Sequence, residues 1–182
     1  MPVPIFVFRR TNKGSYNEGG IRVPLIIKSP GVSKAGRLIG EPVVSNDLYP
    51  ICLSAAGAEL NPNQHMDGVN LKPLLSATED LPRESLFWRF PHYNKRPSSH
   101  PSGVIRKGGW TLSESFDPAT VELYNLSDDL GETTNLAGTH PDRRDALLSG
   151  LEAWRVCVRA ERMLPNPDAG PNEPRGTRKI DR

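Results

Sequence analysis

The sequence predicts an α/β chain of 182 residues that ends in a small antiparallel sheet of four strands covered by one long helix. Two observations support this prediction. After residue 84, short segments rich in β-branched and aromatic residues are separated by glycine or polar turns. Near residue 150, apolar residues recur at spacings of four, three and four, which is the period of one helix face.

The first third of the chain predicts one strand and one helix. β-branched residues are dense at residues 21–27, and Ser29-Pro30-Gly31 then marks a turn. A helix is expected at residues 45–56, with Ser45 as its N-cap and Gly57 as its stop signal. Asp47 is expected to be an acid of the first helical turn with a structural role.

The second half predicts the sheet and its covering helix. Strands are expected at residues 85–90 and 121–126, and residues 104–112 predict two strands joined by a glycine turn. The final helix is expected at residues 141–163. Its apolar face comprises Leu147, Leu151, Trp154 and Val158.

The polar stretch at residues 76–83 is the best candidate for a boundary between two parts of the chain. It divides the sequence into residues 1–79, residues 80–163 and a tail at residues 164–182. The tail contains four prolines and has no hydrophobic period, which is typical of a disordered segment.

Composition narrows the classes of partner. The 23 basic and 21 acidic side chains are interspersed and give a net charge of +2. This charge distribution does not favour binding to nucleic acid or to a membrane surface. No apolar run is long enough to span a bilayer, and no signal peptide is recognisable. Partners are expected to be small or carbohydrate-like. Cys52 and Cys157 are expected to be buried free thiols, since each lies in an apolar helical pattern.

The segment at residues 12–24, Asn-Lys-Gly-Ser-Tyr-Asn-Glu-Gly-Gly-Ile-Arg-Val-Pro, combines a cation with a flexible turn. It resembles an active-site segment of the sulfatase family, in which a Lys-Gly pair is followed by Glu-Gly-Gly-x-Arg-x-Pro. The resemblance implies that Lys13 binds the sulfate group in catalysis. An ammonium suits this role because it stabilises charge that grows on the sulfate oxygens as the ester is cleaved. Glu18 and Arg22 are expected to brace the turn. The alternative is an exposed turn with solvated charges.

Three later segments resemble the same family in the same order. They are the helix around Asp47, the Asp67-Gly68 turn with its following leucines, and residues 123–136, which are similar to the family's C-terminal Leu-Tyr-Asn-Leu signature. The resemblance implies that residues 1–79 are the last part of a large mixed-sheet sulfatase domain. It also implies that residues 80–163 form the small C-terminal subdomain of sheet and helix.

The loop at residues 90–100 is the second candidate site. It gathers two histidines, two cations and a tyrosine directly after a strand, where binding groups are commonly held. The family resemblance implies that this loop lies at the rim of the catalytic pocket and that His92 contacts the substrate. Arg89 replaces the first histidine of the family pattern. The alternative is an ordinary exposed loop with a packed tyrosine.

Neither cysteine stands in the Cys-x-Pro/Ala-x-Arg pattern that sulfatases mature to the formylglycine nucleophile. The resemblance also implies a divalent ion, usually calcium, in the complete family enzyme, held by ligands that belong to segments outside this chain. Asp128, Asp129 and Glu132 are hard oxygen donors, but their spacing is not that of an EF-hand, so they are expected to be solvated carboxylates of a turn.

Two functional hypotheses follow. In the first, the chain is the C-terminal part of a sulfuric ester hydrolase and acts on a sulfated small molecule or carbohydrate together with a missing N-terminal half. In the second, it is a non-catalytic sulfatase remnant or a carbohydrate-binding module. Localisation is not fixed by the sequence, although the family is commonly exported.

Overall fold

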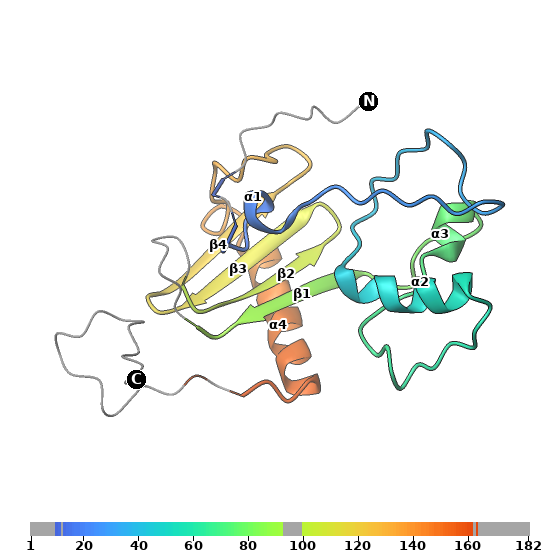
Figure 1. Cartoon of the computed structure of the whole chain (residues 1–182). Helices are drawn as coiled ribbons and strands as arrows, with labels where there is room; N and C mark the ends of the chain where they lie inside the picture. The colour runs from blue at the N-terminus through green and yellow to red at the C-terminus, as the bar shows by residue number, and fades with distance from the viewer. Residues whose placement is uncertain (1–9, 12, 93–99, 162, 164–182) are drawn as a thin grey trace, which may run out of the picture. The chain divides into compact units, whose positions relative to one another are not determined.

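The computed structural model describes residues 10–11, 13–92, 100–161 and 163, and it divides the chain into two compact units (Figure 1). Unit 1 joins the segment before Pro24 to the part of the chain from Ser85 onward, and unit 2 is Pro24–Glu84. The N-terminal motif therefore packs with the C-terminal sheet. The predicted tail at residues 164–182 lies outside the described residues.

Unit 1 contains the four predicted strands as an antiparallel meander in the order β1-β2-β3-β4. Residues Gly108 and Gly109 connect β2 to β3, and Gly108 has a φ of +58°, a conformation that glycine adopts without steric cost. The α/β prediction with a four-stranded sheet is confirmed. The strand bounds are Ser85–Phe90 for β1, Ser102–Lys107 for β2, Trp110–Phe116 for β3 and Ala119–Asn125 for β4.

Helix α4, Pro141–Cys157, covers one face of this sheet (Figure 1). Leu147 and Leu151 pack against side chains that β2, β3 and β4 place in register, and Trp154 stacks on Phe87 with 4.9 Å between the ring centroids. The helix ends six residues before the predicted Met163, so Val158 lies beyond it and is exposed rather than part of the apolar face. The sheet residues of this core are Ile105, Leu112 and Leu123.

The opposite face of the sheet is covered by residues 10–11 and 13–22. Successive side chains of a strand point to opposite faces, so Arg106 points away from the α4 side occupied by Ile105. Arg106 pairs there with Glu18 of the short helix α1, Glu18–Ile21. The strand predicted at residues 21–27 is not formed. A strand needs a neighbouring strand to pair with, and residues 22–29 pair with no strand in the described structure.

Unit 2 is built from η1, Ser45–Asp47, helix α2, Leu48–Ala55, and helix α3, Lys72–Ser76. The predicted helix is confirmed, but Val44 rather than Ser45 precedes its first turn. Ile51, Leu71 and Leu75 form the core of the unit.

Asp47 holds unit 2 together more strongly than a first-turn acid would. Its side chain is fully buried and pairs with Arg83 at 2.8 Å. It also accepts backbone hydrogen bonds from Val44 and Val69, each at 2.9 Å. A Cβ on Gly68 would stand 2.3 Å from the Asn46 carbonyl oxygen, so glycine is needed where this turn passes the helix start.

Both cysteines are free, as predicted, but the prediction that they are buried is wrong. Cys52 and Cys157 are exposed, because each lies on the solvent side of its helix. Among the described residues, no helix combines the length and apolarity needed to cross a membrane.

Candidate functional site

Lys13 is exposed in a turn at the start of the segment that covers the sheet. Gly14 next to it has a φ of +97°, which favours glycine at that position. Within the described part of the chain, no ion pair or hydrogen bond engages the Lys13 side chain.

Glu18 is the buried centre of the motif. Its two carboxylate oxygens pair with Arg22 and Arg106, each at 2.9 Å, and only 3% of its side chain is exposed. Burying a carboxylate is costly unless cations and hydrogen bonds satisfy it, and both oxygens are satisfied here. The structure thus supports the expected bracing role of Glu18 and Arg22, and adds Arg106 of β2 as their anchor on the sheet.

Position 20 of the motif requires glycine. A Cβ on this residue would stand 2.3 Å from the carbonyl oxygen of Ser15, so the backbone can pass only if residue 20 has no side chain. The hydrogen bond from Gly20 N–H to the Asn17 carbonyl oxygen, at 2.7 Å, completes the tight turn.

Glu132 reaches the same segment from the loop after β4. Its carboxylate accepts the Glu18 backbone N–H at 2.8 Å and the Asn17 side-chain amide at 3.2 Å. Burial raises the pKa of Glu132 above its ordinary 4.5, and the negative charge of Glu18 acts in the same direction. Glu132 was expected to be solvated, and this prediction is wrong because its side chain is buried under the motif.

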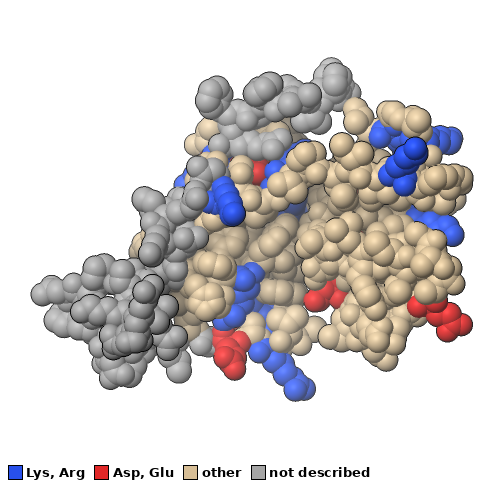
Figure 2. Space-filling view, in the orientation of Figure 1, with Lys and Arg blue, Asp and Glu red and all other residues tan. Residues whose placement is uncertain are grey.

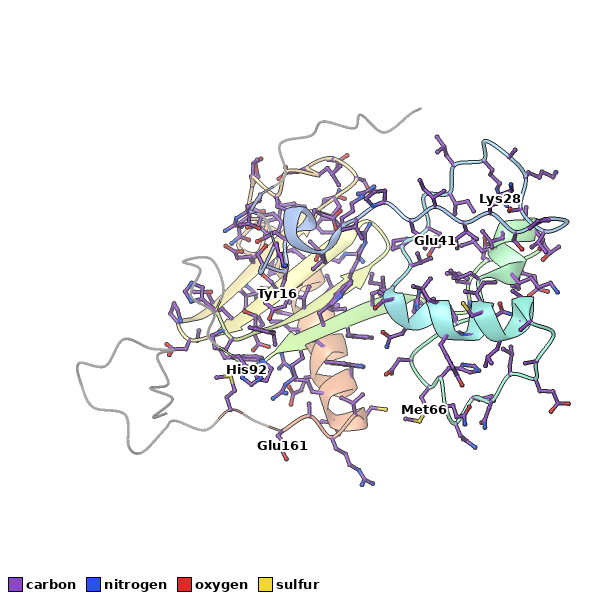
Figure 3. The ribbon with its side chains drawn as sticks, viewed as in Figure 1. Tyr16, Lys28, Glu41, Met66, His92 and Glu161 are labelled. Atoms are coloured by element: carbon purple, nitrogen blue, oxygen red, sulfur yellow. The ribbon has the colours of Figure 1, made fainter. Side chains whose placement is uncertain are left out.

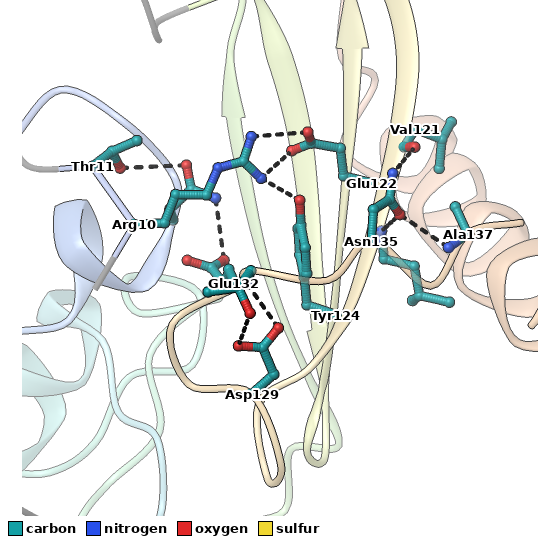
Figure 4. Close-up of polar contacts among 12 residues, drawn as sticks. Arg10, Thr11, Val121, Glu122, Tyr124, Asp129, Glu132, Asn135 and Ala137 are labelled. Atoms are coloured by element: carbon teal, nitrogen blue, oxygen red, sulfur yellow. Dashed lines mark hydrogen bonds and ion pairs between the residues drawn. The ribbon is translucent and has the colours of Figure 1, made fainter. Parts of the chain in front are cut away.

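Arg10 fastens the beginning of the segment to β4. Its guanidinium forms a two-pronged contact with Glu122, at 3.0 Å for each pair of atoms, and donates to the Tyr124 hydroxyl (Figure 4). Burial raises the pKa of Tyr124 to about 12. Tyr124 therefore stays a neutral hydroxyl over the physiological range and presents no extra charge beside Glu132.

His92 is exposed two residues after the end of β1 (Figure 3). Aromatic contacts connect its strand to the Lys13 segment. The rings of Phe90 and His92 meet edge to face at 5.4 Å, and Tyr16 meets Phe90 at 6.0 Å on the N-terminal side. The Tyr16 hydroxyl also donates to the Phe90 carbonyl oxygen at 3.5 Å. The structure thus brings the motif segment and the start of the His92 loop into contact. Residues 93–99 of that loop lie outside the described residues.

The acidic loop after β4 uses its carboxylates within the fold. Asp129 accepts the backbone N–H groups of Thr133 and Thr134 at 2.7 and 2.9 Å, and Asp128 accepts the Asn125 amide at 2.6 Å. Among the residues that the structure describes, no three His, Cys, Asp or Glu side chains form a group able to hold a metal ion.

Sequence reasoning missed two parts of this arrangement, Tyr16 and Glu132. The sequence assigned no role to Tyr16, and only the contact with Phe90, 74 residues away, shows its packing role. Glu132 looked like one of several turn acids. The available signal was that both partners, Glu18 and Glu132, lie within segments with family resemblance.

Basic side chains lie at several separate places on the face drawn in Figure 2 and do not form one block. Acidic side chains are interspersed among them. Among the residues drawn in colour, this distribution fits the small net charge of +2 of the full sequence.

Comparisons with known proteins agree with this architecture. The family described as N-sulphoglucosamine sulphohydrolase, C-terminal, matches residues 10–151. A sulfatase of Formosa agariphila is 36% identical over 162 residues, which cover 81% of this chain and 29% of the relative. Human arylsulfatase A is 34% identical over 166 residues, which cover 81% of this chain and 32% of the relative.

Among solved structures, Ps i-CgsB in complex with k-i-k-neocarrahexaose is similar with a TM-score of 0.65 and 26% identity. The match covers 80% of this chain and 31% of that protein. The chain thus spans roughly a third of the length of each relative named here.

Proposed function

Because the chain belongs to the sulfatase family and corresponds to its C-terminal portion, we propose that it supplies Lys13 as a sulfate-binding residue and His92 as a substrate contact of a sulfuric ester hydrolase. The main support for this proposal is that the Lys13 segment and the strand leading to His92 pack against each other through Tyr16 and Phe90. Two chemically suited groups are thereby held on one unit.

Lys13 binds the sulfate group and stabilises it as the ester bond breaks. Negative charge on the sulfate oxygens increases in the transition state, so a fixed ammonium lowers the barrier more than it strengthens ground-state binding. The exposed position of Lys13 supports this role, because its cation has no ionic partner among the described residues. The buried contacts of Glu18 keep the backbone behind it in place.

The substrate is a sulfated carbohydrate, and His92 contacts the sugar that carries the sulfate. The matching family is named for the hydrolysis of N-sulphoglucosamine, and the similar protein Ps i-CgsB was solved in complex with k-i-k-neocarrahexaose. An imidazole beside an aromatic ring suits a sugar, since it offers hydrogen bonds at the edge of an apolar surface.

The nucleophile and the metal belong to polypeptide outside these 182 residues. Neither Cys52 nor Cys157 has the sequence context of a formylglycine precursor. The calcium that the family resemblance implies for the complete enzyme would be held by ligands in segments outside this chain. Bound there, the cation would supply charge stabilisation at the sulfate.

A binding titration tests the role of Lys13 in the chain itself. The ¹⁵N-labelled chain is titrated with a sulfated carrageenan oligosaccharide and with its desulfated counterpart. We expect shifts at Lys13, Gly14 and His92 only with the sulfated sugar, and a loss of affinity of about tenfold in Lys13→Gln, which removes one charged hydrogen bond.

Lys28→Gln is the matched control, because Lys28 is an exposed lysine of unit 2 (Figure 3). It should leave the affinity unchanged. Equal losses in the two variants would mean that binding follows net charge alone, and the assignment of Lys13 would be rejected.

A further inference from the structure

We propose that Glu132 is a positioning residue for Lys13, because its carboxylate fastens the motif segment to the loop after β4. The functional meaning of this inference rests on the sulfate-binding role proposed for Lys13. The fastening itself rests only on contacts within unit 1.

The contact joins two sequence motifs that lie far apart in the chain. Glu132 accepts hydrogen bonds from two neighbouring residues of the motif segment, the Glu18 backbone and the Asn17 side chain, at 2.8 and 3.2 Å. The two glutamates are separated by 114 positions in the sequence. Asn17 and Glu18 lie in the turn that ends at Gly20 and follow Lys13 by four and five positions, so fixing them limits the positions that the Lys13 backbone can take.

The backbone of Glu132 supports a specific role for its side chain. Its φ of +54° lies in the left-handed region, where side chains other than glycine and asparagine are disfavoured. Neighbouring contacts hold the loop in this shape, since Glu132 N–H donates to the Asp129 carbonyl oxygen at 3.1 Å and Asp129 caps the following turn. Glu132 thus keeps a disfavoured backbone conformation in which its carboxylate contacts the motif segment.

The charges around Glu132 come from each element packed against it. Glu18 lies on the motif side with its own cations, Arg22 and Arg106, while Arg10 and Tyr124 lie toward β4. The pKa of Glu132 is raised by burial and by Glu18, and Arg10 opposes this rise. Ionisation of Glu132 therefore occurs above pH 4.5 and changes the strength of both hydrogen bonds, since an ionised acceptor binds N–H donors more strongly.

The segment has other anchors, so loss of Glu132 should loosen it without unfolding unit 1. Glu18 remains paired with Arg106, and Arg10 remains paired with Glu122. Glu132→Gln keeps an oxygen acceptor and removes the titration, whereas Glu132→Ala removes both. Glu79→Gln makes the same chemical change at an exposed acid of unit 2 and is the matched control.

The test follows backbone amide resonances of the ¹⁵N-labelled full chain between pH 3 and pH 8. We expect the amides of Glu18 and Lys13 to titrate with one common midpoint above 4.5, and this shared titration to disappear in Glu132→Gln but persist in Glu79→Gln. Hydrogen exchange at residues 13–20 should accelerate about tenfold in Glu132→Ala, while exchange in β2 and β3 stays unchanged.

Two results would overturn the proposal: a Lys13 amide that does not follow the titration of the Glu18 amide, or a titration that survives in Glu132→Gln. If Glu132→Ala also loses hydrogen-exchange protection in β2 and β3, that variant has unfolded more than the motif segment. The titration of Glu132→Gln then tests the proposal by itself. None of these readouts involves sulfate. A shared titration together with unchanged sugar affinity in Lys13→Gln would reject the proposed function and leave the fastening by Glu132 in place.

Discussion

Gly20 lies against the backbone of Ser15, where a Cβ on residue 20 would stand 2.3 Å from a carbonyl oxygen. Gly20→Ala must therefore displace the turn, and we expect it to lower the free energy of unfolding of unit 1 by about 1–3 kcal/mol. Urea unfolding followed by tryptophan fluorescence measures this change, because all three tryptophans of the chain, at positions 88, 110 and 154, lie in unit 1.

Gly138→Ala is the control in the same unit, since a Cβ there meets no heavy atom within 4 Å. It should change the stability by less than about 0.5 kcal/mol. Equal effects of the two substitutions would show that chain flexibility, and not the close approach to Ser15, determines the cost.

Asp47 gives unit 2 a defined dependence on pH. Burial alone would raise its pKa, but hydrogen bonds from Arg83, Val44 and Val69 hold the pKa below its ordinary 3.8. The unfolded chain therefore binds this proton at a higher pH than the folded chain does. The stabilisation by Asp47 is present above about pH 3.8 and is lost as the pH falls through the lower, folded-state pKa.

Asp47→Asn keeps the shape of the side chain and leaves Arg83 without its charged partner. We expect a loss of about 3 kcal/mol at pH 7, measured by hydrogen exchange of the α2 amides, and a smaller difference from the parent chain at pH 3. The same difference at both values would contradict the assigned role of the Asp47 charge.

At the scale of elements, α4 stabilises the sheet through one narrow apolar stripe. Leu151 is fully buried between helix and sheet, whereas Val156 on the same helix is 68% exposed. Leu151→Ala should destabilise unit 1 by about 2–5 kcal/mol because it leaves a cavity, and Val156→Ala should have little effect. The same fluorescence titration measures both, and similar costs would mean that helix propensity rather than packing is responsible.

The strands and the long helix could be predicted because their signals are local. Segments such as residues 85–90 show the residue types of a strand and are bounded by turns, and both features act within a few positions. The predicted strand at residues 21–27 fails for the opposite reason. Its apolar residues satisfy the local rule, but Val23 and Ile26 are exposed here and no neighbouring strand pairs with them in the described structure.

The candidate site could be predicted in its exposed parts and not in its support. Lys13 and His92 follow from motif resemblance, and their roles stay predictions. The contacts that hold the Lys13 segment, Glu18 with Arg106 and Glu18 with Glu132, join residues 88 and 114 positions apart. Such pairs depend on how the whole unit closes, which no short window of sequence contains.

For the whole molecule, we expect no activity from the chain alone. Purified by itself, it should release no detectable sulfate from an aryl sulfate, because neither Cys52 nor Cys157 has the sequence context of a formylglycine precursor. When an N-terminal sulfatase portion restores turnover, Lys13→Ala should lower the rate by about 10²-fold, by analogy with losing one oxyanion donor.

Lys28→Ala should leave that restored rate unchanged and serves as its control. Turnover by the isolated chain would show that these residues contain a nucleophile after all. A restored rate that is insensitive to Lys13→Ala would remove Lys13 from the reaction.

Unit 1 is assembled from two stretches of chain with all of Pro24–Glu84 between them. The stretch before Pro24 leaves the ribosome before the rest of unit 1, and β4, which it contacts, ends only at Asn125, about a hundred residues later. At about 5–20 residues per second, translation keeps this stretch waiting for roughly 5–20 s. During that interval Arg10 and Glu18 lack the sheet residues with which they pair, so unit 1 can close only after β4 has been synthesised.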